Sequence, residues 1–124
     1  MDKPIQTYLD TYEFNVLANR VWEYIGPEEL YMQLAEEAAE LSQACSKMAR
    51  YLHHTNPVDK HLTKLDLEDN VIEELADVSL LMRMVVDWSY VRGHSHDNTD
   101  DAICKIEDYK MKRWLQRLEE ADNA

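Results

Sequence analysis

Residues 31–52 read YMQLAEEAAELSQACSKMARYL and contain neither glycine nor proline. The apolar side chains of this stretch recur at alternating spacings of three and four residues, as on one side of a helix that packs against a neighbour. The members of this row are Tyr31, Leu34, Ala38, Leu41, Cys45, Met48 and Leu52. The pattern predicts a long amphipathic helix, over about residues 28–53, with a packing seam along it.

Helix-breaking residues on either side of this stretch divide the rest of the chain. Gly26-Pro27 suits the end of one helix and the first turn of the next, and a polar connection with Asn56-Pro57 follows the second helix. Asp66 is the expected cap of the third helix. The four expected helices cover about residues 5–24, 28–53, 66–92 and 99–120.

Composition supports a single all-α domain over residues 1–124. The chain holds only 2 Gly and 3 Pro, and residues that favour helices are abundant. Four helices joined by short to moderate loops pack most simply as a four-helix bundle.

Charge and hydrophobicity exclude some classes of function. A formal net charge of −12 opposes binding to a nucleic-acid polymer, although an acidic protein can still bind a phosphate compound through divalent cations. No apolar run approaches the roughly 20 residues of a membrane span, and no signal peptide is apparent. We therefore expect a cytoplasmic protein without a membrane partner.

The third helix places carboxylates among apolar residues. On a helical wheel, Glu74 falls in the middle of an apolar arc and Asp77 lies at its edge, while Arg83 and Asp87 point to the opposite side. The arc consists of Val71, Leu75, Val78, Leu81, Met82 and Val85. A buried, ionised carboxylate must be protonated, paired with a base or bound to a cation.

The second helix supplies a matching pair of carboxylates. Glu37 lies beside the packing seam and Glu40 is one turn further on. Two such pairs on facing helices would form a cage of oxygen ligands that suits Mg²⁺, with Mn²⁺ as a substitute. The alternative is that either pair makes ordinary surface ion pairs. Glu36 shares a face with polar residues, so at most it lies behind the metal ligands.

The fourth helix carries a basic stripe. Lys110, Arg113 and Arg117 share an arc with Ile103 and Ile106, so a face that begins apolar ends basic. These cations could hold phosphate oxygens, with arginine binding in a bidentate manner. Alternatively they complement the helix C-terminus and pair with the glutamates that follow them.

Three segments together resemble a known family. Residues 33–44 (QLAEEAAELSQA), 72–82 (IEELADVSLLM) and 108–120 (DYKMKRWLQRLEE) resemble the MazG-like all-α nucleoside triphosphate pyrophosphohydrolases. That family pairs an EExxE helix with an ExxD helix and adds a C-terminal Lys-x-x-Arg helix. The resemblance covers about residues 26–120, and the connection between the two carboxylate helices is longer here than in compact members.

The resemblance implies hydrolysis of a nucleoside or deoxynucleoside triphosphate to the monophosphate and pyrophosphate. It implies Mg²⁺ ligands at Glu37, Glu40, Glu74 and Asp77, with Glu36 as the extra leading glutamate. It also places Lys110 and Arg113 near the substrate phosphates.

Within the hydrolysis that the resemblance implies, further roles are assigned to residues of the second helix. Glu40 is our choice for orienting the attacking water. Gln33 and Lys47 lie on the Glu37 and Glu40 side of that helix and are candidate substrate contacts.

A stripe of small residues on the second helix predicts close helix approach. We expect it to make a homodimer or a dimer of dimers, although packing within one chain explains the stripe equally well. The stripe consists of Ala35, Ala39, Ser42, Ser46 and Ala49.

Two other readings compete with a hydrolase. A di-iron carboxylate bundle would normally need Glu-x-x-His pairs, and no histidine of the chain has a glutamate three residues before it. A non-catalytic acidic helical adaptor would use its carboxylates only for solubility, and it has no reason to place Glu74 among valines.

Overall fold

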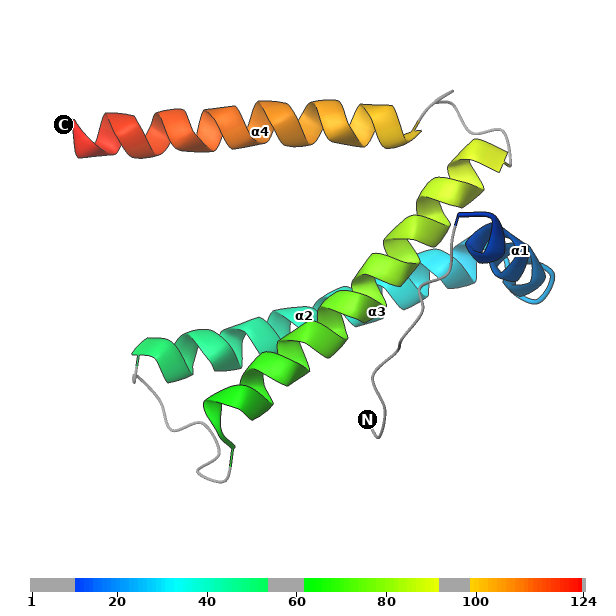
Figure 1. Cartoon of the computed structure of the whole chain (residues 1–124), viewed down its shortest axis with the longest axis horizontal. Coiled ribbons are helices and arrows are strands. Elements are labelled where there is room, and N and C mark those ends of the chain that lie inside the picture. The colour runs from blue at the N-terminus through cyan, green and yellow to red at the C-terminus, as the bar shows by residue number, and fades with distance from the viewer. Residues whose placement is uncertain (1–10, 54–61, 92–98, 124) are drawn as a thin grey trace. The chain divides into compact units, whose positions relative to one another are not determined.

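The computed structural model describes residues 11–53, 62–91 and 99–123. These residues form four α-helices and no strand, which confirms the all-α class for the described part of the chain (Figure 1). The helices are α1 (Thr11–Trp22), α2 (Pro27–His53), α3 (Lys64–Val91) and α4 (Thr99–Asp122). None of them combines the length and the apolar character that crossing a membrane requires.

The helix boundaries agree closely with the sequence expectation. The chain turns between α1 and α2 at Gly26, whose carbonyl oxygen accepts a hydrogen bond of 3.2 Å from the amide of Leu30. Residues 5–10, where the first helix was expected to begin, lie outside the described part of the chain. The chain divides into two compact units, one up to Val85 and one from Val86 onward, so the boundary falls within α3.

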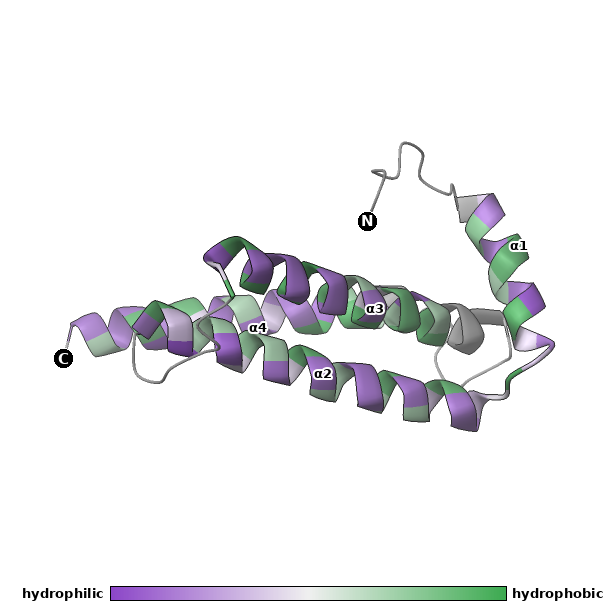
Figure 2. Ribbon diagram, turned by 90° about the horizontal axis from the view of Figure 1, so that it is seen from below, coloured by the Kyte–Doolittle hydropathy of each residue, from purple (hydrophilic) through white to green (hydrophobic). Residues whose placement is uncertain are grey.

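Helices α2 and α3 form an antiparallel hairpin in the first unit (Figure 1). Hydrophobic and hydrophilic residues alternate along both helices, as expected for amphipathic partners (Figure 2). The buried apolar side chains come from all three helices of this unit, because α1 packs three of its residues into the same core. They are Phe14, Ala18, Trp22, Leu30, Ala44, Leu67, Leu81 and Met84.

The packing seam of α2 is displaced from the row that the sequence predicts. Leu34, Leu41 and Met48 are half-buried, as predicted, and the seam also includes the buried Leu30, before Leu34, and Ala44, between Leu41 and Met48. The other predicted seam residues, Tyr31, Ala38, Cys45 and Leu52, are exposed, so their placement in the seam was wrong. The apolar stripe of α2 is wider than one partner helix covers, and periodicity alone does not select the covered row.

Helix α1 is held to α3 partly by a charged side chain. The guanidinium carbon of Arg83 lies 3.7 Å from the centroid of the Phe14 ring. A cation over the face of an aromatic ring is attracted by the ring quadrupole. Arg83 is exposed, as its position on the wheel predicts, but its side chain also covers the buried Phe14.

A capping box begins α3. The hydroxyl of Thr63 accepts a hydrogen bond of 3.1 Å from the amide of Asp66, and the Asp66 carboxylate accepts one of 2.9 Å from the amide of Thr63. Thr63 is therefore the N-cap and Asp66 is the reciprocal partner three residues later, which corrects the expectation that Asp66 is the cap. The hydrogen bonds from Thr63 lower the pKa of Asp66 below its ordinary value.

Replacing the capping threonine should destabilise the first unit without altering its fold. Thr63→Ala removes one acceptor for an orphan amide at the start of α3, and such a loss costs about 1 kcal/mol. Thermal and urea unfolding followed by circular dichroism measure the change. Thr63→Ser, which keeps the hydroxyl, should stay close to the wild type. Equal stability of the wild type and Thr63→Ala would show that the cap contributes nothing.

Candidate metal centre

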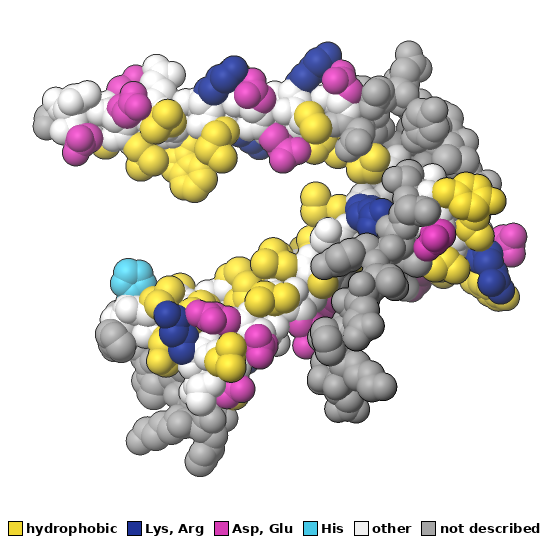
Figure 3. Space-filling model, in the orientation of Figure 1, with side chains coloured by type: hydrophobic (Ala, Val, Ile, Leu, Met, Phe, Trp, Pro, Cys, Tyr) yellow, Lys and Arg dark blue, Asp and Glu magenta, His cyan; other side chains and the backbone are white. Residues whose placement is uncertain are grey.

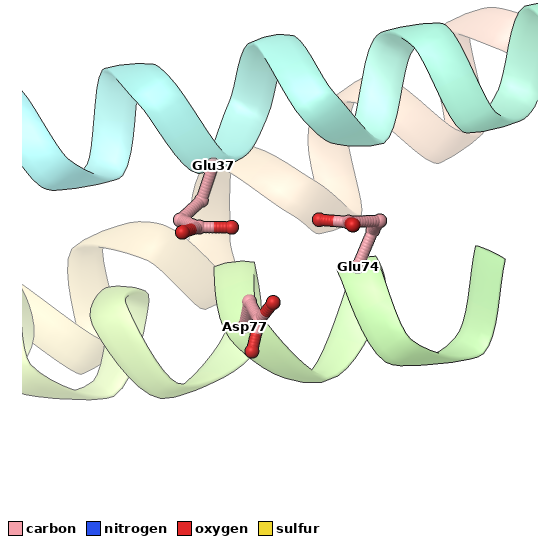
Figure 4. Close-up of side chains that lie close together, drawn as sticks. All are labelled: Glu37, Glu74 and Asp77. Carbon is pink, nitrogen blue, oxygen red and sulfur yellow. The ribbon is translucent and has the colours of Figure 1, made fainter. Parts of the chain in front are cut away.

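Three carboxylates from α2 and α3 converge between the helices. One oxygen from each of Glu37, Glu74 and Asp77 lies within 4.8 Å of the other two (Figure 4). Glu37 projects from α2, and the other two residues lie three positions apart on α3, where side chains occupy the same face. The hairpin therefore brings together residues that are 37 positions apart in the sequence, from Glu37 to Glu74.

Two of these carboxylates have an oxygen withdrawn from solvent. The Oε2 atoms of Glu37 and Glu74 are buried and accept no hydrogen bond from the described residues. Glu37 occupies a position of the α2 seam between the half-buried Leu34 and Leu41, rather than a position beside the seam as the sequence analysis expected. A buried polar atom without a partner costs free energy, so these two oxygens favour a ligand between the helices.

The electrostatics of the cluster strongly disfavour the ionised form of Glu37. Burial, followed by a hydrogen bond with Glu40 and the neighbouring negative charges, raises the pKa of Glu37 from 4.5 to about 7. Burial is also the largest cause that raises the pKa of Glu74, followed by the charges of Glu40 and Asp77. Desolvation and like charges act in the same direction here.

The chain offers this cluster no basic side chain among the described residues. Every charge that shifts the pKa of Glu37 or Glu74 is negative. The ion pairs of Lys64 with Glu68, Lys105 with Asp101 and Lys112 with Asp108 lie on exposed surfaces of single helices. A buried carboxylate is normally compensated by protonation, a base or a metal ion. Because no base is available, protonation or a bound metal ion remains as the compensation.

Glu40 belongs to the site but differs from the three converging residues. It is exposed, and it lies close enough to Glu37 and Glu74 to share hydrogen bonds with both. It is not part of the group whose oxygens lie within 4.8 Å of one another. Glu40 thus lies at the solvent-exposed side of the cluster. A side chain in that place can contact either a bound ligand or a water molecule.

The other predicted site residues lie apart from this cluster or in the second unit. Glu36 and Lys47 are exposed on α2, and the half-buried Gln33 donates a hydrogen bond of 3.2 Å to Glu29. Lys110 and Arg113 are exposed on α4, which belongs to the second unit.

Glu73 is not among the residues predicted from the sequence, although its charge contributes to the raised pKa of Glu74. Its position next to Glu74 in the sequence was the available signal. A neighbouring glutamate on a helix is not aimed into the same face, but its charge still acts over a few ångströms.

The donor set fits a hard divalent cation. Carboxylate oxygens are the ligands that Mg²⁺, Mn²⁺ and Ca²⁺ prefer, and no histidine or cysteine joins the described group. A divalent ion would satisfy both buried Oε2 atoms and remove the repulsion within the cluster at once. Held near the solvent side, it would also accept phosphate oxygens.

Comparison of the chain with family models, curated proteins and solved structures finds no match.

The metal-free protein should become less stable as the pH rises from the pKa of Glu37 in the unfolded chain, 4.5, to its pKa in the folded protein, about 7. The folded state holds its proton up to about pH 7, whereas the unfolded state releases it near 4.5. Stability from this group is therefore complete below pH 4.5 and lost as the pH rises through about 7.

Thermal unfolding in EDTA, from pH 4.5 to 8, measures this effect. Glu37→Gln should flatten the profile, because glutamine carries no titrating proton. A profile of the same slope in both proteins would contradict the raised pKa.

Divalent cations should stabilise the protein above pH 7 through this cluster. Binding to the folded state alone adds about 2.7 kcal/mol when the free ion is about 100 times its dissociation constant. Glu74→Gln should be more stable than the wild type without metal, since it removes repulsion, and should gain little from Mg²⁺ or Mn²⁺. Calorimetric titration and thermal unfolding measure both quantities. Glu68→Gln, on the surface of the same helix, is the control.

Proposed function

We propose that this protein is a Mg²⁺-dependent hydrolase that cleaves nucleoside or deoxynucleoside triphosphates to the monophosphate and pyrophosphate. The observation that carries the proposal is the convergence of Glu37, Glu74 and Asp77 at a place with two buried, unpartnered oxygens. The resemblance of the α2, α3 and α4 segments to MazG-like pyrophosphohydrolases supplies the reaction and the substrate class. Mn²⁺ would be expected to substitute for Mg²⁺.

In this mechanism the hairpin provides a fixed set of oxygen ligands. Glu37, Glu74, Asp77 and Glu40 would hold the ion, which would neutralise phosphate charge and polarise the phosphorus. Because two of the ligands come from one helix turn of α3, their spacing is maintained by the backbone of the helix. A rigid ligand set lowers the cost of binding the substrate phosphates in a reactive geometry.

Glu40 has the position of the residue that orients the attacking water. It is exposed while its neighbours are half-buried, and it shares hydrogen bonds with Glu37 and Glu74. Its carboxylate accepts a hydrogen bond from water and takes up the proton as the oxygen attacks. The new bond forms between that oxygen and phosphorus, the α–β anhydride bond breaks, and pyrophosphate leaves.

Cationic residues are required to complete a triphosphate site. We assign this role to Lys110 and Arg113 of α4, with Gln33 and Lys47 of α2 as further contacts and Glu36 behind the ligands. Lys110 has no ion pair with the carboxylates of the described residues, and the Arg113 guanidinium lies 5.8 Å from the Tyr109 ring centroid. Both side chains are exposed and available to phosphate oxygens.

We also propose that the protein acts in the cytoplasm as a homodimer or homotetramer.

A non-catalytic acidic adaptor would gain nothing from turning Glu37 and Glu74 into the hairpin, where their ionisation is unfavourable. The carboxylate geometry therefore favours a metal-dependent enzyme over an adaptor.

The decisive assay follows pyrophosphate release from a panel of ribo- and deoxynucleoside triphosphates with and without Mg²⁺. Turnover should require the metal, and Glu74→Gln and Glu40→Gln should each lower kcat/KM by at least about 100-fold. Glu68→Gln should retain wild-type turnover. If no triphosphate of the panel is hydrolysed with Mg²⁺ or Mn²⁺ by a protein that binds the ion, the proposed reaction is wrong. If Glu74→Gln hydrolyses as fast as the wild type, the assigned site is wrong.

A further inference from the structure

Asn70 is a polar residue on the inward side of α3. At about 100° per residue, its direction from the helix axis falls between those of Glu74 and Asp77, which both reach the carboxylate cluster. Asn70 is half-buried, and Leu67, one turn before it, is buried. Asparagine is a weak helix former, and an apolar residue would suit a half-buried place in a packing seam better. The amide at this place therefore has a reason other than stability.

The side-chain amide of Asn70 has no hydrogen-bond partner within the described residues. The side-chain hydrogen bonds at the start of α3 join Thr63 and Asp66, one turn earlier. Asn70 takes part neither in these nor in the other side-chain hydrogen bonds of that part of the chain. Both N–H groups on Nδ2 are therefore available to an acceptor on a neighbouring turn.

The acceptor one turn further along α3 is Glu74. Cβ atoms of residues four apart on a helix lie about 5–6 Å from each other, and helical side chains lean toward the N-terminus. The Glu74 carboxylate therefore extends over the turn that carries Asn70. Its Oε2 atom is buried and accepts no hydrogen bond in the described part of the chain. An unpaired donor and an unpaired acceptor thus share one face of α3, and rotation about side-chain torsions suffices to join them.

Two other donors of the hairpin already have acceptors. On the face that Figure 3 shows, acidic and hydrophobic side chains gather along the α2–α3 pair. Gln33, the half-buried amide of α2, donates to Glu29 at 3.2 Å, and Lys64 pairs with Glu68 at 3.8 Å. Asn70 therefore has the place and the free N–H groups to serve the carboxylate cluster.

We propose that Asn70 is a positioning residue of the metal site, whose Nδ2–H donates a hydrogen bond to one oxygen of Glu74 while the other oxygen binds the divalent ion. A carboxylate that binds a metal through one oxygen keeps lone pairs on the other, and a donor there fixes the orientation of the group. The inference rests on the metal site of the proposed function and not on the hydrolytic reaction.

A neutral amide suits this role better than a basic side chain would. Lysine or arginine would compensate Glu74 by its own charge and would repel the cation. Asn70 supplies an N–H donor without a charge, so the negative charge of the cluster remains available to the ion.

Calorimetric titration of the full chain with Mg²⁺ and Mn²⁺ above pH 7 tests this role. Asn70→Leu keeps nearly the same side-chain size and removes the donor, and it should raise the dissociation constant at least about 10-fold. Asn70→Gln keeps the amide and should stay within about three-fold of the wild type. Gln43→Leu, which removes an exposed amide from α2, is the control and should change the constant by less than about two-fold.

Thermal unfolding in EDTA separates this role from a merely structural one. Asn70→Leu should be at least as stable as the wild type without metal, because leucine favours both the helix and the half-buried seam. It should then gain less stability than the wild type from the same concentration of Mg²⁺, because it binds the ion more weakly.

Three outcomes would overturn the assignment. The first is equal metal affinity of Asn70→Leu and the wild type. The second is a loss of affinity that Asn70→Gln shares, because a retained amide should restore binding. The third is a wild-type protein that takes up neither ion, which removes the metal site and this role with it. Triphosphate hydrolysis does not enter these measurements, so a failure of the proposed reaction is distinguishable from a failure of the role of Asn70.

Discussion

The feature on which the rest of this structure depends is a pair of inward-facing glutamates in the α2–α3 hairpin, where burial and neighbouring negative charge disfavour ionisation. Glu37 and Glu74 turn toward each other, each with one oxygen out of reach of solvent and without a hydrogen-bond partner among the described residues. Burial and like charges raise the pKa of both groups, that of Glu37 to about 7. A hairpin built only for stability would place apolar side chains there. The stability lost at this level is the physical reason to regard the cluster as functional.

The exposed surface of the hairpin differs in chemistry from one row of residues to the next. Glu40 is exposed beside the carboxylate cluster, whereas Ala38 on α2 and Leu75 on α3 expose apolar side chains. An acidic chain can bind a phosphate compound if a divalent ion lies between the two negative partners.

Helix α4 carries a run of positive charge in the second unit. Within residues 109–118 it carries Lys110, Lys112, Arg113 and Arg117 and no acidic residue. Lys112 is engaged with Asp108 at 2.8 Å, whereas the others form no ion pair with the described residues. In the proposed hydrolase, Lys110, Arg113 and Arg117 would balance the phosphate charge that a divalent ion does not neutralise.

The sequence by itself determined the number and approximate bounds of the helices, because glycine, proline and capping residues act locally and few of them occur in this chain. It also selected Glu37, Glu74 and Asp77, since the 3.6-residue period places a carboxylate on an apolar arc without reference to any other helix.

Only the tertiary structure decided which of two adjacent apolar rows each helix buries. Leu34 and Val78 came to lie inside, while Ala38 and Leu75 stayed outside. It also moved Glu37 into the seam itself and made Thr63 the cap of α3. The reason is physical: a helix with an apolar stripe wider than one neighbour has several packings of similar local energy, and the contacts with the partner helix select among them.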